Sequence, residues 1–362
     1  MTTMKKYLMM FATLAVMTAC NNEVLTDDLP PIDPNAQKSV IGFRSWNNNQ
    51  RSAGDYELEE YHSTFVVYGT KCDELDAVQT VFDAVTCTYD QPGTDITGQW
   101  KYTPARYWDK QAKNYKFVAY TPTNAPIEYS FTGEVGSSTA QFKSTAPLKL
   151  KGTNLQQGDP QEEELNVGFT GDKDLDVMIT KDVNTVTSFP SSMPDVDLVF
   201  GHTLSKLVVS IVTPFDSLKG RVIINNVTVK DYLSEGTFAL DSNKYVWMAD
   251  TLSSKINYSY TSPAKALAQD TATCFIESLI FPQALTPTQQ VVINYTIVSA
   301  DGTYSEDYNY KVDVNKIFTE TTNYKSDTVY NIEFTINPEK NVIKFDAGVY
   351  EWSDKETGEK EL

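Results

Sequence analysis

Hydrophobic and polar residues alternate with a period of two along most of the chain. The clearest runs lie at 207–211, 291–297 and 330–336, and weaker ones at 64–69 and 115–120. β-branched and aromatic residues at this spacing, interrupted by Asn, Asp, Gly and Pro, are typical of half-buried antiparallel strands. Helical periodicity is almost absent beyond the first twenty residues. The pattern therefore predicts an all-β protein made of antiparallel β-sandwiches, most simply two.

A polar stretch at 181–197, KDVNTVTSFPSSMPDVD, separates the two groups of predicted strands. Ser and Pro at its centre are typical of segments that join domains. We expect an N-terminal domain at residues 38–190 and a C-terminal domain at residues 191–362. Residues 20–37, which are rich in Asn, Asp and Pro, are expected to form a flexible tether before the first strand.

The first twenty residues have the pattern of an export signal. Two lysines precede a short apolar run that ends in the small residues before Cys20. The run is too short to span a bilayer, which takes about 20 apolar residues. We predict a signal peptide at residues 1–19. The cysteine after small residues resembles the lipobox of bacterial lipoproteins, which implies a lipid on Cys20; an ordinary secreted protein is the alternative.

The charge of the chain argues against nucleic acid as a partner. It carries 30 Lys and Arg against 48 Asp and Glu, a net charge of -18 at pH 7. Such a surface repels phosphate backbones and anionic lipid headgroups. We therefore expect no nucleic-acid partner.

The cysteines and His202 are the first features that bear on chemistry, and neither favours catalysis. Cys72 and Cys87 either form a bridge across neighbouring strands or are small buried hydrophobes. His202, at the start of a predicted strand, fits a packing or capping role better than that of a base. The sequence contains no Gly-x-Ser-x-Gly, no phosphate-binding glycine loop and no His-Glu-x-x-His, and nothing in it singles out a carboxylate pair for glycoside hydrolysis.

The alternation of Asp172, Asp174 and Asp176 is superficially similar to a calcium-binding loop. The glycine and the distal glutamate of such a loop are missing, so a solvated strand entry fits the segment better. We therefore expect no metal ion, no cofactor and no catalytic residues, and we expect that the protein is not an enzyme.

Several segments in a fixed order resemble the fimbrillin-like lipoproteins of Bacteroidales. They are GQWKYTPARYWDKQAKNYKFVAYTP at 98–122, DLDVMIT at 174–180, LVFGHTLSKLVVSI at 198–211, DTVYNIEFTI at 327–336 and a terminal strand that ends in Trp352. The resemblance covers nearly the whole mature chain. It implies a type V pilus subunit with two transthyretin-like β-sandwich domains, anchored by lipid at the outer membrane as a precursor and found in the fimbrium after processing.

The resemblance also implies assembly by strand exchange after proteolysis. In that scheme a surface protease cuts after an arginine, which removes the first strand and opens a groove. Residues 39–43 have the pattern of a short strand, and Arg44 and Arg51 follow it as candidate cleavage sites. Ordinary exposed loop arginines are the alternative reading of both. The implied partners are other fimbrial subunits, a maturation protease and the outer membrane.

The C-terminal segment is the candidate donor strand for such an exchange. Ile343, Phe345, Ala347 and Val349 lie on one face of this predicted strand. A strand that simply completes the sheet of its own domain is the open alternative.

A surface lipoprotein that binds glycans is the alternative function. Aromatic side chains can stack on sugar rings, and Trp100, Tyr102, Tyr107 and Trp108 are crowded together in the sequence. The same residues also fit core positions. We predict a structural subunit of a fimbria that supports cell adhesion, and glycans or proteins on host or bacterial surfaces are additional candidate partners.

Overall fold

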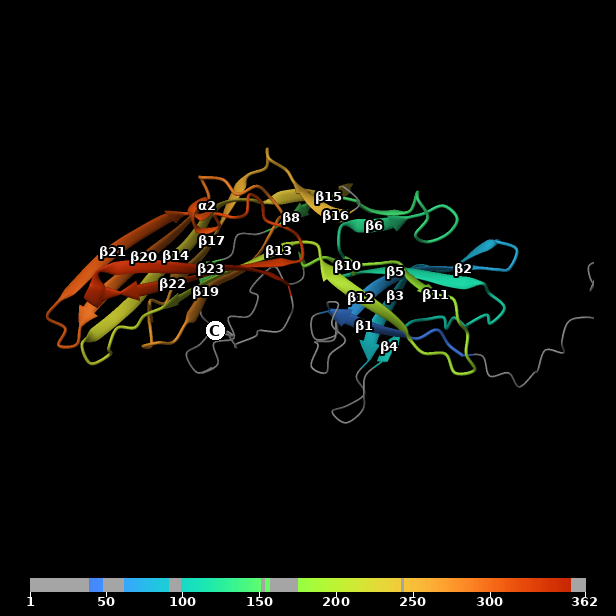
Figure 1. Cartoon of the computed structure of the whole chain (residues 1–362), viewed down its shortest axis with the longest axis horizontal. Helices are drawn as coiled ribbons and strands as arrows, with labels where there is room; N and C mark the ends of the chain where they lie inside the picture. Colours follow the sequence, from blue (N-terminus) through green and yellow to red (C-terminus); the bar gives the residue numbers. More distant parts are fainter. Residues whose placement is uncertain are drawn as a thin grey trace, which may run out of the picture. The chain divides into compact units, whose positions relative to one another are not determined.

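The structure is a computed structural model that describes residues 39–47, 62–90, 99–150, 154–156, 175–241 and 244–352. Nearly all regular structure in these residues is β-strand, which confirms the all-β prediction (Figure 1). The exceptions are the short helix α2 (Val314–Ile317) and the 3-10 turn η2 (Pro338–Lys340). In this part of the chain no helix is long and apolar enough to cross a membrane.

The largest sheet has eight strands and is built from the N-terminal half of the chain. These strands are β1 (Phe43–Asn47), β2 (Thr64–Cys72), β3 (Val78–Asp90), β4 (Gln99–Lys101), β5 (Asn114–Thr121), β10 (Met178–Thr180), β11 (Asn184–Val186) and β12 (Val196–His202). Their order is β1-β12-β10-β5-β2-β3-β4, and β11 also pairs with β5. The sheet thus begins with β1 and β12, which are far apart in the sequence.

Both faces of this sheet are covered by side chains. On β2, Phe65 and Val67 belong to one core, whereas Val66 and Tyr68 belong to another. Trp100 and Trp108 are buried in the first of these cores. Trp100, Trp108 and the partly buried Tyr102 therefore act in packing, whereas Tyr107 is 47% exposed, so these residues do not together form an exposed aromatic platform for glycans.

Two further sheets face each other, and all their strands except β9 come from the C-terminal half of the chain. One has the order β19-β13-β22-β23, and the other has the order β21-β20-β14-β17-β9 with β18 also paired to β14. Their strands are β9 (Asn154–Gln156), β13 (Ser205–Val212), β14 (Gly220–Leu233), β17 (Lys255–Ser262), β18 (Lys265–Ala266), β19 (Thr273–Ile280), β20 (Gln290–Ser299), β21 (Ser305–Asp313), β22 (Thr328–Asn337) and β23 (Val342–Glu351). Alternate residues of the facing strands, among them Val209, Val229 and Ile332, form one core.

Two small sheets complete the described strands. They consist of β6 (Ile127–Ser130) with β7 (Gln141–Ser144), and of β8 (Leu148–Lys149), β15 (Glu235–Asp241) and β16 (Lys244–Ala249). Their apolar residues share a core with Tyr68, Leu204, Phe281 and Trp352. This core therefore draws residues from both halves of the chain.

The segment at 181–197 contributes to the N-terminal sheet. It contains β11, which pairs with β5, and it runs into β12, which pairs with β1 and β10. The domain boundary expected near residue 190 stays a prediction. We propose that it lies between His202 and Ser205, where the chain passes from this sheet into β13.

Among the described strands, three pairs are parallel, namely β1 with β12, β13 with β22, and β9 with β17. The sheets, which were expected to be antiparallel, are therefore antiparallel for the most part and contain these parallel pairs. Parallel and antiparallel strands share the same alternation of side chains, so a period of two does not distinguish them.

Cys72 and Cys87 form no disulfide. They lie on the paired strands β2 and β3, but Cys72 is opposite Val78 whereas Cys87 is opposite Phe65. The seven positions from Phe65 to Cys72 span about 23 Å of strand, whereas bridged cysteines need Cα atoms within about 7 Å. The bridge is therefore wrong, and the alternative of two buried thiols is confirmed. Burial raises the pKa of the Cys87 thiol.

Candidate functional site

Strand β1 is an edge strand of the described sheet, and its inward residues Phe43 and Ser45 are buried. It pairs with β12 alone in the sheet, in parallel register from Phe43 to Asn47. Ile41, just before β1, donates its N–H to the carbonyl of Arg106 at 2.9 Å, and its own carbonyl accepts the Tyr102 hydroxyl at 2.7 Å. The segment is thus held by β12 and by the loop that contains Tyr102 and Arg106.

Phe43 is the main apolar anchor of β1. It is buried, and its ring centroid lies 5.3 to 5.9 Å from those of four aromatic residues, Phe65, Phe82, Tyr102 and Phe117. Three of these contacts are edge-to-face, a geometry that aromatic pairs favour. Loss of β1 would expose these rings and leave one edge of β12 unpaired.

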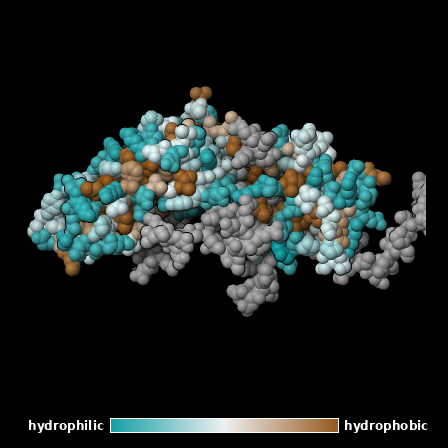
Figure 2. All heavy atoms as spheres, viewed as in Figure 1, coloured by the Kyte–Doolittle hydropathy of each residue, from teal (hydrophilic) through white to brown (hydrophobic). Residues whose placement is uncertain are grey.

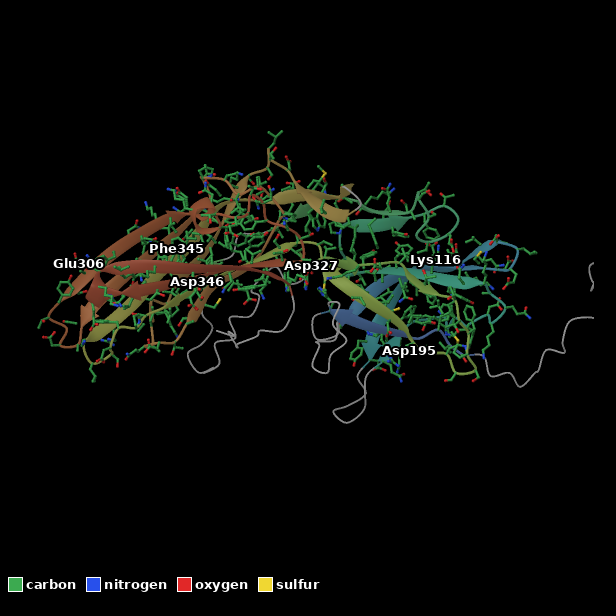
Figure 3. The ribbon with its side chains drawn as sticks, in the orientation of Figure 1. Lys116, Asp195, Glu306, Asp327, Phe345 and Asp346 are labelled. Carbon is green, nitrogen blue, oxygen red and sulfur yellow. The ribbon has the colours of Figure 1, made fainter. Side chains whose placement is uncertain are left out.

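Arg44, one of the two predicted cleavage residues, lies inside β1 opposite Asp197. Its side chain is 57% exposed, and its Nε is 3.6 Å from Oδ2 of Asp195, which is labelled in Figure 3. Asp195 fits there because Gly42 has no side chain; a Cβ at Gly42 would clash with the carboxylate. The other candidate, Arg51, and the lipidation candidate, Cys20, lie outside the described residues.

Strand β23 is the edge strand near the other end of the chain. It pairs with β22 at all ten of its positions. Ile343 and Ala347 pack against the C-terminal core, whereas Phe345 and Val349 are 39% and 47% exposed (Figure 3). Hydrophobic residues also reach the surface over the C-terminal strands in Figure 2. In this state the strand completes its own sheet, with its apolar face only partly covered.

Trp352 anchors the chain directly after β23. Its ring is 2% exposed and stacks on the imidazole of His202, with centroids 3.7 Å apart and planes 5° from parallel. Its backbone N–H donates to the carbonyl of Asp327 at 2.9 Å, and the Nζ of Lys206 lies 5.7 Å from the ring centroid. The end of β23 is therefore fixed by the end of β12 and the start of β22.

His202 and Asp176 form a buried pair. The Nδ1 of His202 is 2.7 Å from Oδ2 of Asp176, and both side chains are almost inaccessible to solvent. Nε2 of His62 lies 3.1 Å from the Asp176 carbonyl. The second carboxylate oxygen of Asp176, Oδ1, has no hydrogen-bond partner within the described residues. The stack on Trp352 confirms a packing role for His202.

The solvated strand entry expected for the three aspartates is wrong at Asp176, because this residue is fully buried. Asp172 and Asp174 lie outside the described residues. Where the structure does describe the chain, no group of three or more His, Cys, Asp or Glu side chains is placed to hold a metal ion.

Asp327 joins β12 to the start of β22. Its Oδ2 lies 2.6 Å from the Nζ of Lys181, and its Oδ1 accepts the backbone N–H of His202 at 3.2 Å. Figure 3 labels this residue. Gly201 leaves room for the lysine stem, since a Cβ at this position would lie 2.6 Å from Cε of Lys181.

We expect Gly201→Ala to lower the free energy of unfolding by about 1–2 kcal/mol, because the new methyl group displaces Lys181 from Asp327. Urea denaturation would measure the change. In a Lys181→Ala background, the same substitution should have less than half of this effect, since the displaced side chain is already absent. Equal effects in the two backgrounds would contradict the steric explanation.

Sequence reasoning did not bring Asp176, His202, Asp327 and Trp352 together. Each of them lies in a segment that carried the family resemblance, and this shared membership was the only available signal. Spacing along the chain could not reveal the cluster, since up to 176 positions separate its members (352 − 176 = 176).

Comparisons with known proteins agree with this architecture. The sequence model of the fimbrillin-like family matches residues 60–352, which confirms the resemblance seen in the sequence. A fimbrial protein from Bacteroides vulgatus has 14% identity and a TM-score of 0.54, over 87% of this chain and 99% of that chain. The fimbrial anchor protein Mfa2 from Porphyromonas gingivalis has 10% identity and a TM-score of 0.30, over 87% and 99%. A search of curated proteins finds no match.

Proposed function

The chain belongs to the fimbrillin-like family, and from this premise we propose that it is a fimbrial subunit that polymerises by strand exchange. The precursor would be exported with a signal peptide, carry lipid on Cys20 and stand at the outer membrane until a protease releases it into the fimbrium. Family membership favours a structural role in cell adhesion over an enzymatic one.

The buried edge strand β1 is the observation that carries the proposal. Its removal would uncover four aromatic rings around the position of Phe43 and the unpaired polar groups of β12. Unpaired strand edges beside apolar surface favour pairing with a strand from another chain. Burial of each large side chain in this groove would contribute about 1.5–3 kcal/mol.

Strand β23 supports the proposal from the donor side. Its inward-facing residues Phe345 and Val349 stay about half exposed in its own sheet. Transfer into a groove on another subunit would replace the ladder with β22 by a new ladder, and it would bury these two side chains more fully. The difference in apolar burial would drive the exchange.

The geometry of β1 favours Arg51 over Arg44 as the cleavage residue. A cut after Arg44 would split β1 and leave residues 45–47 paired with β12. A cut after Arg51, four positions beyond the end of β1, would remove the strand whole. Arg44 also lies within the ladder between β1 and β12. The backbone of this segment is therefore already paired and is not free to bind in the active site of a protease.

The test is controlled cleavage of the purified precursor with an arginine-specific protease. We expect cleavage after Arg51 to produce ladders that resist SDS. Arg51→Ala should prevent them, whereas Arg44→Ala should not.

Phe345→Asp combined with Val349→Asp should abolish the ladders after normal cleavage, because neither carboxylate can enter an apolar groove without a large desolvation penalty.

The matched control changes the opposite face of the same strand. Lys344→Ala with Asp346→Ala removes two exposed side chains and should leave the ladders intact. If the subunit stays monomeric after confirmed loss of β1, the proposal of polymerisation by strand exchange fails.

A further inference from the structure

Strand β12 contacts both ends of the proposed exchange. Its residues Val196–Phe200 pair with β1, and its last residue, His202, stacks on Trp352. The removable strand and the anchor of the candidate donor strand are therefore attached to one short element.

The two contacts share one edge of β12. Towards β10, the carbonyl of Val199 accepts the N–H of Lys181 at 2.9 Å, and the N–H of Thr203 donates to Val177 at 3.0 Å. Backbone groups of successive residues point to opposite sides of a strand. The N–H of His202 therefore points to the side where β1 is bound, and there it donates to Asp327.

The first half of β12 has its strand ladder with β1, and its other edge accepts single hydrogen bonds from the Lys181 N–H at Val199 and from the Asn184 side-chain amide at Asp197. Strand β10 pairs with β12 only from Phe200 to His202, whereas β1 covers Val196 to Phe200. The N–H of Val196 donates to the carbonyl of Gly42 at 2.8 Å. Loss of β1 would remove the only ladder partner of Val196–Val199, which lie directly before the end of β12 at His202.

Asp327 carries the connection from β12 to β23. Its φ is 55°, in the left-handed region that is uncommon for a residue with a side chain. Its N–H donates to the carbonyl of Leu204 at 2.9 Å, its carboxylate contacts Lys181 and His202, and its carbonyl accepts the N–H of Trp352. The conformation that receives Trp352 is thus maintained by contacts with β12 and its neighbours.

We propose that His202, Asp327 and Trp352 form a latch through which β12 couples the two edge strands. With β1 in place, β12 holds His202 and Asp327 so that Trp352 keeps β23 on β22. Removal of β1 loosens β12, weakens the stack on Trp352 and frees β23 for donation. The biological role of this latch rests on the proposed function. The latch would keep the donor strand β23 on its own sheet until β1 is lost.

Hydrogen–deuterium exchange of the full chain tests the latch in the absence of polymerisation. Peptides covering β23 should exchange about 100-fold faster in Trp352→Ala, because a buried indole then no longer opposes local opening. Trp352→Phe, a milder variant, should give an intermediate increase. The matched control is Tyr350→Ala, which removes a 55% exposed ring from the same strand and should change exchange by less than about threefold.

The coupling is tested by removing β1 from the same protein. Residues 48–51 are replaced by the recognition sequence of a specific protease, and loss of the strand is confirmed by mass. At a dilution where light scattering shows only monomer, β23 should then exchange at least about tenfold faster. In Trp352→Ala the additional increase should be less than about twofold, because the latch is already open.

Two results would overturn the latch. One is an unchanged exchange rate of β23 after β1 is lost, and the other is an equal increase in the wild type and in Trp352→Ala. Failure of the proposed function has a different signature. If β23 exchange rises as expected but no ladders form at high concentration, the latch stands and polymerisation by strand exchange does not.

Discussion

Phe43→Ala is expected to lower the free energy of unfolding of the N-terminal sheet by about 3–5 kcal/mol, the usual range for truncation of a buried phenylalanine. The ring is buried among Phe65, Phe82, Tyr102 and Phe117, so its removal leaves a cavity lined by aromatic groups. It also removes the main side-chain anchor of β1. Urea denaturation followed by tryptophan fluorescence would measure the loss.

Val40→Ala is the matched control for this prediction. Val40 lies three residues earlier in the same segment, but its side chain is 49% exposed and it makes only an isolated backbone bridge to Tyr107. Its truncation should change the free energy of unfolding by less than about 0.5 kcal/mol. A similar loss for both variants would show that β1 is not anchored by Phe43.

The second large effect is a loss of stability in alkaline solution. The hydroxyls of Tyr232 and Tyr324 lie 2.8 Å apart in the C-terminal core, and burial raises the pKa of both tyrosines. Burial also raises the pKa of Tyr120 to about 12. These side chains are neutral in the folded protein, whereas unfolded tyrosines ionise with a pKa of about 10.

The sign of the effect follows from proton binding. Above about pH 10 the folded protein binds more protons at these tyrosines than the unfolded chain does. Their contribution to stability is therefore complete below that pH, and it is lost as the pH rises towards their folded pKa values. Each tyrosine should lower the free energy of unfolding by about 1.4 kcal/mol per pH unit in this range.

Tyrosinate absorbance and circular dichroism during an alkaline titration would measure this behaviour. The absorbance of the buried tyrosines should rise together with unfolding. Tyr232→Phe should reduce the slope of the free energy of unfolding against pH by about 1.4 kcal/mol per pH unit, the contribution of one tyrosine. Tyr350→Phe, which changes an exposed residue, should leave this slope unchanged. Ionisation of all tyrosines well before unfolding would contradict the prediction.

Local sequence pattern indicated the two segments that matter most for the proposed function, one of them with shifted bounds. The short strand expected at 39–43 shares only Phe43 with β1 (Phe43–Asn47), so its bounds were placed four residues too early, whereas Ile343, Phe345, Ala347 and Val349 all lie in β23. Alternation predicts such strands because side chains of successive residues point to opposite faces. It does not predict which strand lies beside another, since pairing depends on residues far away in the chain.

The errors and omissions have the same physical origin. Cys72 and Cys87 are close in sequence and lie on neighbouring strands, yet the hairpin register places them at opposite ends. Asp176 has the sequence pattern of a solvated residue but is buried beside His202. Neither register nor the burial of a single polar residue can be derived from composition, because each is set by contacts between distant segments.

The sequence by itself determined the all-β class, the fimbrillin-like family and the alternating apolar residues of the C-terminal strand, because these depend on local alternation and on the order of motifs. Only the tertiary structure decided that β12 pairs with β1 while its end meets Trp352. That arrangement joins residues about 150 positions apart (352 − 202 = 150) through a ring stack and the hydrogen bonds of Asp327. Such contacts arise from the folding of whole sheets onto one another, and no local pattern in the chain encodes them.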